Sequence, residues 1–221
     1  MKGVILDLDD TLWHAEEGYR FALKFAGVDP DAAEFLEARA KVKSRLGPGH
    51  VSARNRILYF KTMLDKAGNF SPKRIIELMN RYEQGLQDFI SKQWRELERD
   101  SFLEWLTSQY GVVLLTNETT RTQMIKLSAM DPSAKFLKSV ITSEELGVEK
   151  PNPLMFDEAL KLLKLRPADC AVIGDNWEND IVPSLKIGCK TFWTQEFSEK
   201  KATDGKGATL LKTLEDFRLH A

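Results

Sequence analysis

The sequence predicts an α/β protein in which a parallel sheet is covered by helices on both faces. Two observations lead to this class. Short apolar runs alternate with amphipathic stretches along most of the chain, a pattern typical of parallel strands joined by helical crossovers. One long segment, from about Glu16 to about Arg95, shows helical periodicity only. This segment indicates an all-helical insertion after the first strand.

Five apolar runs are the candidate strands, and in chain order they are Met1–Leu6, Tyr110–Leu115, Phe136–Ile141, Cys170–Gly174 and Lys190–Trp193. Helical patterns lie between them at Thr119–Met130, Pro151–Leu163 and Trp177–Lys186. A proline suits the first turn of a helix because its fixed φ and missing N–H fit there. Gly188 stands just past the third helix, where a left-handed C-cap is commonly needed. Together these elements predict a Rossmann-like parallel sheet core flanked by helices.

The inserted segment is divided by glycine and proline clusters at residues 27–30, 47–49 and 68–72, which predict about four helices. We therefore expect two parts. Residues 1–15 and 96–221 form the α/β core, and residues 16–95 form the inserted helical domain. The polar stretch Glu196–Gly207 predicts a surface loop before a final strand-helix piece.

The composition excludes several classes of protein. With 221 residues, 43% hydrophobic and 29% charged, the chain resembles an ordinary soluble globular protein. A net charge of -1 gives no pull toward nucleic acid or an anionic membrane. No apolar run approaches the roughly 20 residues that span a bilayer, and early acids argue against a signal peptide. Cys170 and Cys189 begin predicted strands, which indicates buried thiols and a reducing, cytoplasmic compartment.

Two carboxylates follow the first predicted strand. Asp7 and Asp9 stand two residues apart, and in an extended segment such residues share one face, about 6–7 Å from each other. Like charges on one face are unfavourable unless a cation or a proton separates them, and Mg²⁺ prefers oxygen ligands of this kind. The carboxyl edge of a parallel sheet is also where such folds bind ligands. The alternative interpretation is a charged turn that closes the strand.

Further polar residues stand at the ends of other predicted strands. Thr116 and Asn117 end the second strand and offer a hydroxyl and backbone N–H groups suited to a phosphoryl oxygen, although Thr there is also a common helix N-cap. Lys150 precedes a helix, where a cation would offset phosphoryl charge. Asp175 ends the fourth strand and would complete a cluster of magnesium ligands. Asp180, five residues on, would hold Lys150 or a bound water.

Taken together, these residues resemble the four motifs of the haloacid dehalogenase superfamily, in the branch with a helical cap inserted after the first strand. The motifs stand as Asp7-Leu8-Asp9-Asp10-Thr11, Val112-Val113-Leu114-Leu115-Thr116, Lys150-Pro151-Asn152-Pro153 and Gly174-Asp175-Asn176-Trp177-Glu178-Asn179-Asp180. The resemblance covers residues 1 to about 195, and the cap matches least in detail.

The resemblance implies a Mg²⁺-dependent phosphohydrolase acting on a small-molecule phosphate monoester. Asp7 would be the nucleophile that forms an aspartyl-phosphate, and Asp9 would act as acid and then base. Thr116 and Lys150 would hold the phosphoryl oxygens. Halide-displacing relatives lack the second aspartate, so Asp9 favours phosphate over halide.

The resemblance also implies a metal site and its support. Asp7, the backbone carbonyl of Asp9, and Asp175 would bind Mg²⁺. Asn179 and Asp180 would lie behind them and orient Lys150 and the metal waters.

Substrate contacts are expected from the core and from the cap. In the core they are Thr116, Asn117 and Lys150. In the cap, the segment of residues 45–56 combines a flexible turn with cations and hydrogen-bonding groups, and its candidates are His50, Arg54 and Arg56. A solvated loop is the equal alternative for this segment. Trp13 and His14 are expected to line the pocket entrance.

Two alternatives to a hydrolase remain at this point. A phosphomutase keeps both aspartates and differs mainly in how long the aspartyl-phosphate survives. The second is a module of another class. A phospho-accepting receiver domain uses similar parts, but carries its acid pair as adjacent residues and its accepting aspartate mid-chain, and a non-catalytic descendant would act as a binding or scaffold module, against which the intact motifs argue. The expected partner is a small phosphorylated metabolite, with no nucleic acid and no membrane, and the expected state is a monomer or homodimer.

Overall fold

The structure is a computed structural model that describes residues 1–198, 201–202 and 204–220. Six strands form one parallel sheet in the order β3-β2-β1-β4-β5-β6. Their bounds are β1 (Gly3–Leu6), β2 (Gly111–Thr116), β3 (Val140–Thr142), β4 (Cys170–Gly174), β5 (Lys190–Thr194) and β6 (Thr209–Leu211). The predicted fold class is confirmed. Because every strand runs the same way, all the carboxyl ends meet at one edge of the sheet.

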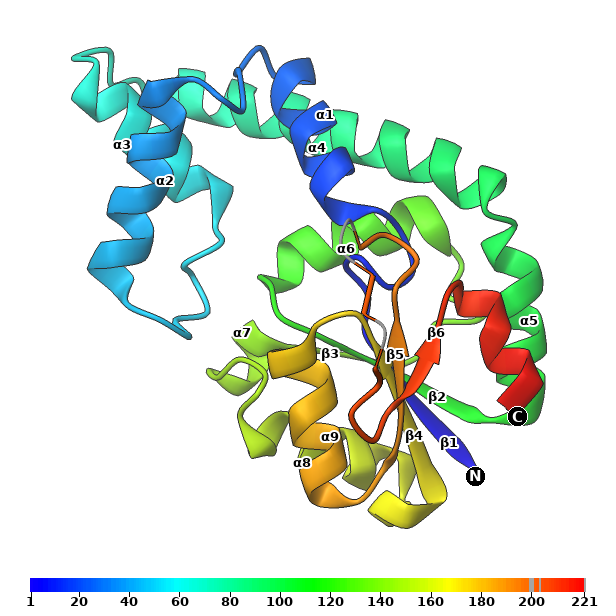
Figure 1. The fold of residues 1–221 in the computed structure, drawn as a ribbon. Coiled ribbons are helices and arrows are strands. Elements are labelled where there is room, and N and C mark those ends of the chain that lie inside the picture. Colours follow the sequence, from blue (N-terminus) through cyan, green and yellow to red (C-terminus); the bar gives the residue numbers. More distant parts are fainter. Residues whose placement is uncertain (199–200, 203, 221) are drawn as a thin grey trace.

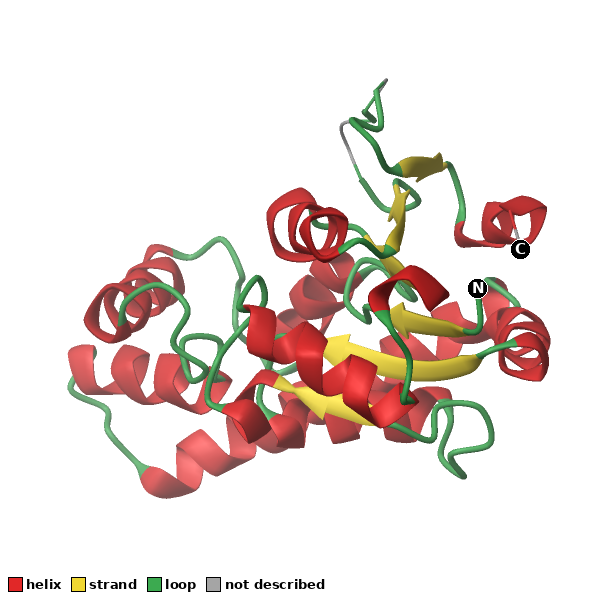
Figure 2. Ribbon diagram, turned by 90° about the horizontal axis from the view of Figure 1, so that it is seen from below, coloured by secondary structure: helices red, strands yellow, loops and turns green. Residues whose placement is uncertain are grey.

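Helices cover both faces of the sheet (Figures 1 and 2). The nine α-helices of the described chain are α1 (Ala15–Phe25), α2 (Ala33–Leu46), α3 (Arg56–Lys66), α4 (Pro72–Glu96), α5 (Arg99–Gln109), α6 (Thr120–Met130), α7 (Ser143–Leu146), α8 (Pro153–Leu163) and α9 (Val182–Ile187). A π-helical turn at Trp177–Ile181 leads into α9, and 3-10 turns occupy Pro167–Asp169 and Leu214–His220. None of these helices has the length and apolar character needed to cross a bilayer.

The two faces of β1 show why the sheet is covered on both sides. Val4 and Leu6 join the core that contains residues of α5 and α6, whereas Ile5 joins the core built with α8. Successive side chains of a strand point to opposite faces, so a strand that is apolar at every position needs cover on both. All four residues of β1 are buried.

Two elements differ from the sequence prediction. The third strand was predicted over Phe136–Ile141, but β3 begins only at Val140. The carboxylate of Asp131 accepts hydrogen bonds from the backbone N–H groups of Phe136 and Leu137, both at 2.8 Å, and this holds the segment in a turn. Helix α5 was not predicted, although its buried Phe102, Leu103 and Leu106 carry helical spacing.

The helical insertion has the four helices that were predicted, α1 to α4, which we call the cap helices. Their starts follow local chemistry: Asn55 accepts a hydrogen bond from the N–H of Ile57 before α3, and Ser71 accepts one from Arg74 before α4. Helices α2 and α3 lie away from the sheet, while α4 reaches back to α6 (Figure 1). The division into separate domains at residues 15 and 96 stays a prediction.

Three smaller predictions concern residues outside the cap helices. The described part of the predicted loop Glu196–Gly207 contains no helix or strand, and its residues 199, 200 and 203 lie outside the described residues. Gly188 ends α9 with φ +86°, the left-handed conformation that was expected. Cys170 and Cys189 are free and buried, as predicted.

Helix α1 crosses α4 at a glycine, which gives a test of this packing. A Cβ added at Gly85 would lie 2.7 Å from Cβ of Phe25 and 3.2 Å from Cα of Ala22. We expect Gly85→Ala to lower the free energy of unfolding by about 1–3 kcal/mol through overpacking, despite a gain in helix propensity. Urea unfolding measures this change, with Asn80→Ala as control on the exposed side of the same helix. Equal stability of both variants would contradict the tight crossing.

Candidate active site

Three carboxylates converge at the carboxyl edge of the sheet. Asp7 follows β1 and Asp175 follows β4, and these two strands are neighbours in register. Asp180 comes from the π-helical turn after β4, and each of the three offers an oxygen within 4.8 Å of the others. Gly174 is required here because a Cβ on it would lie 2.6 Å from Cβ of Asp180.

Lys150 lies between two of these carboxylates. Its ammonium donates to Oδ1 of Asp7 and to Oδ1 of Asp180, both at 2.6 Å. The contact expected between Asp180 and Lys150 is therefore present. Burial alone would lower the pKa of Lys150, but the charges of Asp180 and Asp7 outweigh it and raise that pKa. The lysine is thus a fixed cation at the edge of the sheet.

Asn117 positions Lys150 by a reciprocal pair of hydrogen bonds. Its side-chain oxygen accepts from the N–H of Lys150 at 2.7 Å, and its Nδ2 donates to the carbonyl of Lys150 at 2.9 Å. The amide oxygen and one amide hydrogen are therefore engaged with the backbone. Asn117 lines the cavity, as expected for a substrate contact, but the contact that the structure shows is with the loop of Lys150.

Two threonine hydroxyls also lie at the site, those of Thr116 and Thr11. Thr116 is buried at the end of β2, and its hydroxyl accepts a hydrogen bond from Nε2 of Gln123 at 2.6 Å. Its own hydrogen is therefore free to be donated into the cavity. Thr11 donates to Oδ2 of Asp7 at 2.9 Å, so both oxygens of Asp7 are oriented.

Asp9 is paired with a lysine that the sequence analysis did not identify. Lys126, a fully buried residue of α6, donates to both carboxylate oxygens of Asp9 at 2.7 Å and to the hydroxyl of Tyr19 at 2.7 Å. Burial raises the pKa of Asp9, but the charge and hydrogen bonds of Lys126 outweigh it, and the net pKa is lowered. No clear sequence signal marks this lysine, because α6 lacks a distinct apolar face; its burial beside Leu127 and Met130 is what shows that the cation needs a partner.

The acidic cluster fits a hard divalent cation. Burial raises the pKa of Asp7 to about 7 and that of Asp175 to about 9, with neighbouring carboxylates adding to both shifts. In the described part of the chain, no hydrogen bond or ion pair reaches the Asp175 carboxylate. Oxygen-only donors of this kind suit Mg²⁺ or Ca²⁺. Both oxygens of Asp180 are engaged, by Lys150 and by the N–H of Asn176.

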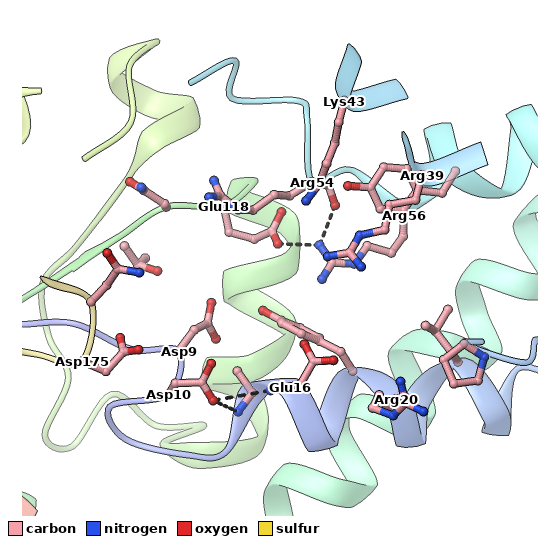
Figure 3. A pocket seen from close by; sticks show the side chains of 18 of the residues that line it. Asp9, Asp10, Glu16, Arg20, Arg39, Lys43, Arg54, Arg56, Glu118 and Asp175 are labelled. Carbon is pink, nitrogen blue, oxygen red and sulfur yellow. Dashed lines mark hydrogen bonds and ion pairs between the residues drawn. The ribbon is translucent and has the colours of Figure 1, made fainter. Parts of the chain in front are cut away.

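A cavity of about 310 Å³ opens above these residues and is lined on the other side by residues of the cap helices (Figure 3). Its floor is acidic and comes from the core, with Asn179 beside the aspartates. Its far wall carries Arg54 and Arg56. Arg56 donates to Oε2 of Glu118 at 2.7 Å and lies over the ring of Tyr19, and Arg54 pairs with Glu149. These two predicted cap residues do face the cavity.

Three other predicted residues do not line it. His50 is exposed and accepts a hydrogen bond from the N–H of Ser52. The expected place of Trp13 at the pocket entrance is wrong, because the side chain is fully buried and donates from Nε1 to Asp9 at 2.9 Å. His14 lies beside the ring of Phe197, at 5.3 Å between centroids, and outside the cavity lining. The sequence places both Trp13 and His14 next to the catalytic loop but does not give the direction of either side chain.

Comparisons with known proteins agree on one family. The sequence model of the haloacid dehalogenase-like hydrolases matches residues 1–186. The chain is 31% identical to the ribulose-1,5-bisphosphate 5-phosphatase of Halopiger xanaduensis, over 91% of this chain and 87% of that protein. It is 36% identical to the glyceraldehyde 3-phosphate phosphatase of Pyrococcus furiosus, over 87% and 80%. A 2-haloacid dehalogenase from Pseudomonas syringae shares the fold, with a TM-score of 0.72 at 21% identity, over 99% and 97%.

The raised pKa values of Asp7 and Asp175 predict how pH changes stability without metal. Their pKa values rise from 3.8 to about 7 and about 9 on folding, so the folded state binds more protons than the unfolded state in that window. The free energy of unfolding contributed by these groups therefore falls as pH rises from about 4 to about 9. A divalent cation binds the ionised carboxylates, so Mg²⁺ should stabilise the protein more at high pH.

Thermal melts in MgCl₂ and in EDTA, at about pH 6 and about pH 8.5, check this expectation. The rise in Tm on adding Mg²⁺ should be several degrees larger at the higher pH. Asp175→Asn should remove most of that difference, while Asp157→Asn, an exposed residue of α8, should leave it. A Tm rise independent of pH and of Asp175 would exclude this cation site.

The buried pair of Lys126 and Asp9 gives a second test. Lys126→Met leaves the Asp9 carboxylate, whose side chain is only 21% exposed, without its counter-charge. We expect a loss of about 3 kcal/mol in the free energy of unfolding. Asp9→Asn removes the negative charge. The double variant Asp9→Asn/Lys126→Met should therefore lose less free energy of unfolding than the sum of the losses in the two single variants. Urea unfolding in EDTA measures this coupling, with Lys138→Met as the exposed control, and additive losses would contradict the pair.

Proposed function

This chain belongs to the haloacid dehalogenase-like hydrolases and is a phosphatase, and we propose that it hydrolyses small phosphate monoesters through an aspartyl-phosphate on Asp7. The resemblance drawn from the four motifs is confirmed at the level of the family. The observation that carries the proposal is the placement of Lys150, bound at 2.6 Å to Asp7 and to Asp180 beside the unpaired carboxylate of Asp175. A phosphoryl group needs such a nucleophile, cation and metal-binding acid together.

Each residue of the site has its own role in the proposed reaction. Asp7 attacks phosphorus with a carboxylate held from both sides, by Lys150 and by Thr11. Lys150 and the free hydroxyl hydrogen of Thr116 bind the phosphoryl oxygens and offset their charge. Asp9 gives a proton to the leaving oxygen, which requires Lys126 to give way to the protonated carboxyl, and later takes one from the water that hydrolyses the aspartyl-phosphate. Each turnover thus returns both aspartates to their starting forms.

Mg²⁺ is the cofactor that we propose for this site. Asp7, Asp175 and the backbone carbonyl of Asp9 would hold it, with Asn179 and Asp180 behind them. When bound, the ion would supply positive charge to the carboxylates and to the phosphoryl oxygens. The side chain of Asp9 is engaged by Lys126 and Trp13, which leaves its carbonyl for this role.

The proposed substrates are small soluble phosphate esters. Two phosphatases that this chain resembles over most of its length carry the names of a sugar bisphosphate and a triose phosphate. A cavity of about 310 Å³ lies at the small end of the range for ligand sites. Two free buried cysteines support a reducing, cytoplasmic location, and a monomer or homodimer stays a prediction.

Phosphate release across a panel of phosphorylated metabolites, with Mg²⁺ and with EDTA, tests this function. We expect wild type to hydrolyse at least one ester and Asp7→Asn to lose roughly a thousand-fold or more in kcat/KM, because the nucleophile is gone. Asp157→Asn, an exposed aspartate of α8, is the matched control and should keep wild-type rates.

Three other outcomes would each overturn the proposal in a different way. Activity retained by Asp7→Asn would exclude this residue as the nucleophile. Conversion of an ester to its positional isomer without phosphate release would indicate a mutase. Failure of wild type on every ester would favour a binding module.

A further inference from the structure

Two cations on α2 face the cavity from the side opposite the acidic floor. Arg39 and Lys43 stand four residues apart, so they share one face of the helix, and both line the cavity. Figure 3 shows them on the cap side, across the cavity from Asp9 and Asp175. Both keep substantial exposure to solvent, so a ligand that enters the cavity can reach them.

The other cations of this wall are already neutralised. Arg54 pairs with Glu149, Arg56 with Glu118, and Arg20 with Asp31. For Arg39 and Lys43, in contrast, residues 1–198, 201–202 and 204–220 provide neither an ion pair nor a hydrogen bond. These two side chains are therefore the uncompensated positive charges of the cavity.

The neighbouring cations are close enough to affect one another. Partial burial lowers the pKa of Lys43, and the charges of Arg39, Arg54 and Arg56 lower it further. Repulsion of this kind is unfavourable in the empty cavity and is relieved when an anion binds between the cations. The carboxylates of Glu118 and Glu149 are already bound to Arg56 and Arg54, so a bound anion is the group that would complement these two charges.

The geometry points to a second anion-binding subsite, and we propose that Arg39 and Lys43 bind a second phosphate of the substrate. This inference rests on the proposed function, because it places the reacting phosphoryl group on the acidic floor. A substrate that spans the cavity then presents its far end to α2. A neutral far end would displace water from two cations without replacing it, which is unfavourable. A phosphate offers three oxygens and up to two charges to the guanidinium and the ammonium.

The volume of the cavity also limits the size of the substrate. A cavity of about 310 Å³ holds a short carbon skeleton with a group at each end. The proposed substrate class is therefore a short-chain bisphosphate, from which the phosphate on the floor is removed and the phosphate at α2 is retained. A carboxylate in the second position would use the same cations with fewer oxygens.

A series of esters with the same leaving alkoxide tests this subsite. Its members are the bisphosphate of a short straight-chain diol, a phosphorylated hydroxy acid of equal length, and the diol monophosphate with a free hydroxyl. We expect wild-type kcat/KM to be highest for the bisphosphate and lowest for the monophosphate. A symmetric bisphosphate offers two equivalent esters, so a preference of about two-fold counts as none.

A double variant and a matched control measure what the two cations contribute. Arg39→Gln/Lys43→Gln should lower kcat/KM for the bisphosphate by roughly 10- to 100-fold more than for the monophosphate, because two charge-assisted contacts are lost. The matched control is Lys41→Gln/Arg45→Gln, which removes the same charge from the same helix at exposed positions outside the cavity. This control should change all three esters by one common factor.

Binding to the Asp7→Asn protein, measured by calorimetry, separates the two proposals. If wild type hydrolyses nothing, tighter binding of bisphosphate than of monophosphate, lost in Arg39→Gln/Lys43→Gln, still supports the subsite. If wild type hydrolyses all three esters equally well and the double variant lowers them equally, the subsite is refuted and the phosphatase stands. Highest kcat/KM for the hydroxy acid, with the same loss in the double variant, would contradict phosphate and assign a carboxylate.

Discussion

The buried ammonium of Lys150 is the interaction on which the rest of the site depends. It lies 2.6 Å from Asp7 and 2.6 Å from Asp180, in a cluster whose carboxylates would otherwise repel one another. Its position follows from the sheet, because β1 and β4 are neighbours and bring Asp7 and the Asp175–Asp180 segment to one edge. Asn117 directly follows β2, the neighbour of β1 on the side opposite β4. Its side chain accepts a hydrogen bond from the backbone N–H of Lys150 and so fixes the position of this lysine.

A second buried lysine gives the two aspartates that follow β1 different environments. Asp7 and Asp9 are two residues apart, yet Asp7 faces Lys150 and the acidic cluster, whereas Asp9 accepts hydrogen bonds from Lys126 and Trp13. Burial and neighbouring acids raise the pKa of Asp7, and Lys126 lowers that of Asp9. Such separation of two carboxylates by their surroundings is how one site assigns different roles to the same side chain. Tyr19 of α1 contacts Lys126, so the cap helices share in this arrangement.

The cavity between core and cap has opposite charges on its two sides. The core provides Asp7, Asp9, Asp10 and Asp175, and the cap provides Arg39 and Lys43 of α2, Arg54 before α3 and Arg56 at the start of α3. The proposed metal and phosphoryl chemistry lies on the acidic side, and the proposed second-phosphate contacts lie on the basic side. This separation would let a chain with a net charge of -1 bind a highly anionic ligand.

The sequence by itself determined the fold class, the helical insertion after β1 and the four motifs, because strand ends and helix starts depend on residues close in the chain. The sequence prediction placed β4 at its observed bounds. It made the third strand too long, because the carboxylate of Asp131 accepts hydrogen bonds from the N–H groups of Phe136 and Leu137. Only the tertiary structure decided which side chains meet. Lys126 reaches Asp9 across 117 positions, Arg56 is neutralised by Glu118, and within the part of the chain that the structure describes Arg39 and Lys43 have no ion-pair partner. Such pairings depend on how helices pack in space, and no local pattern encodes that.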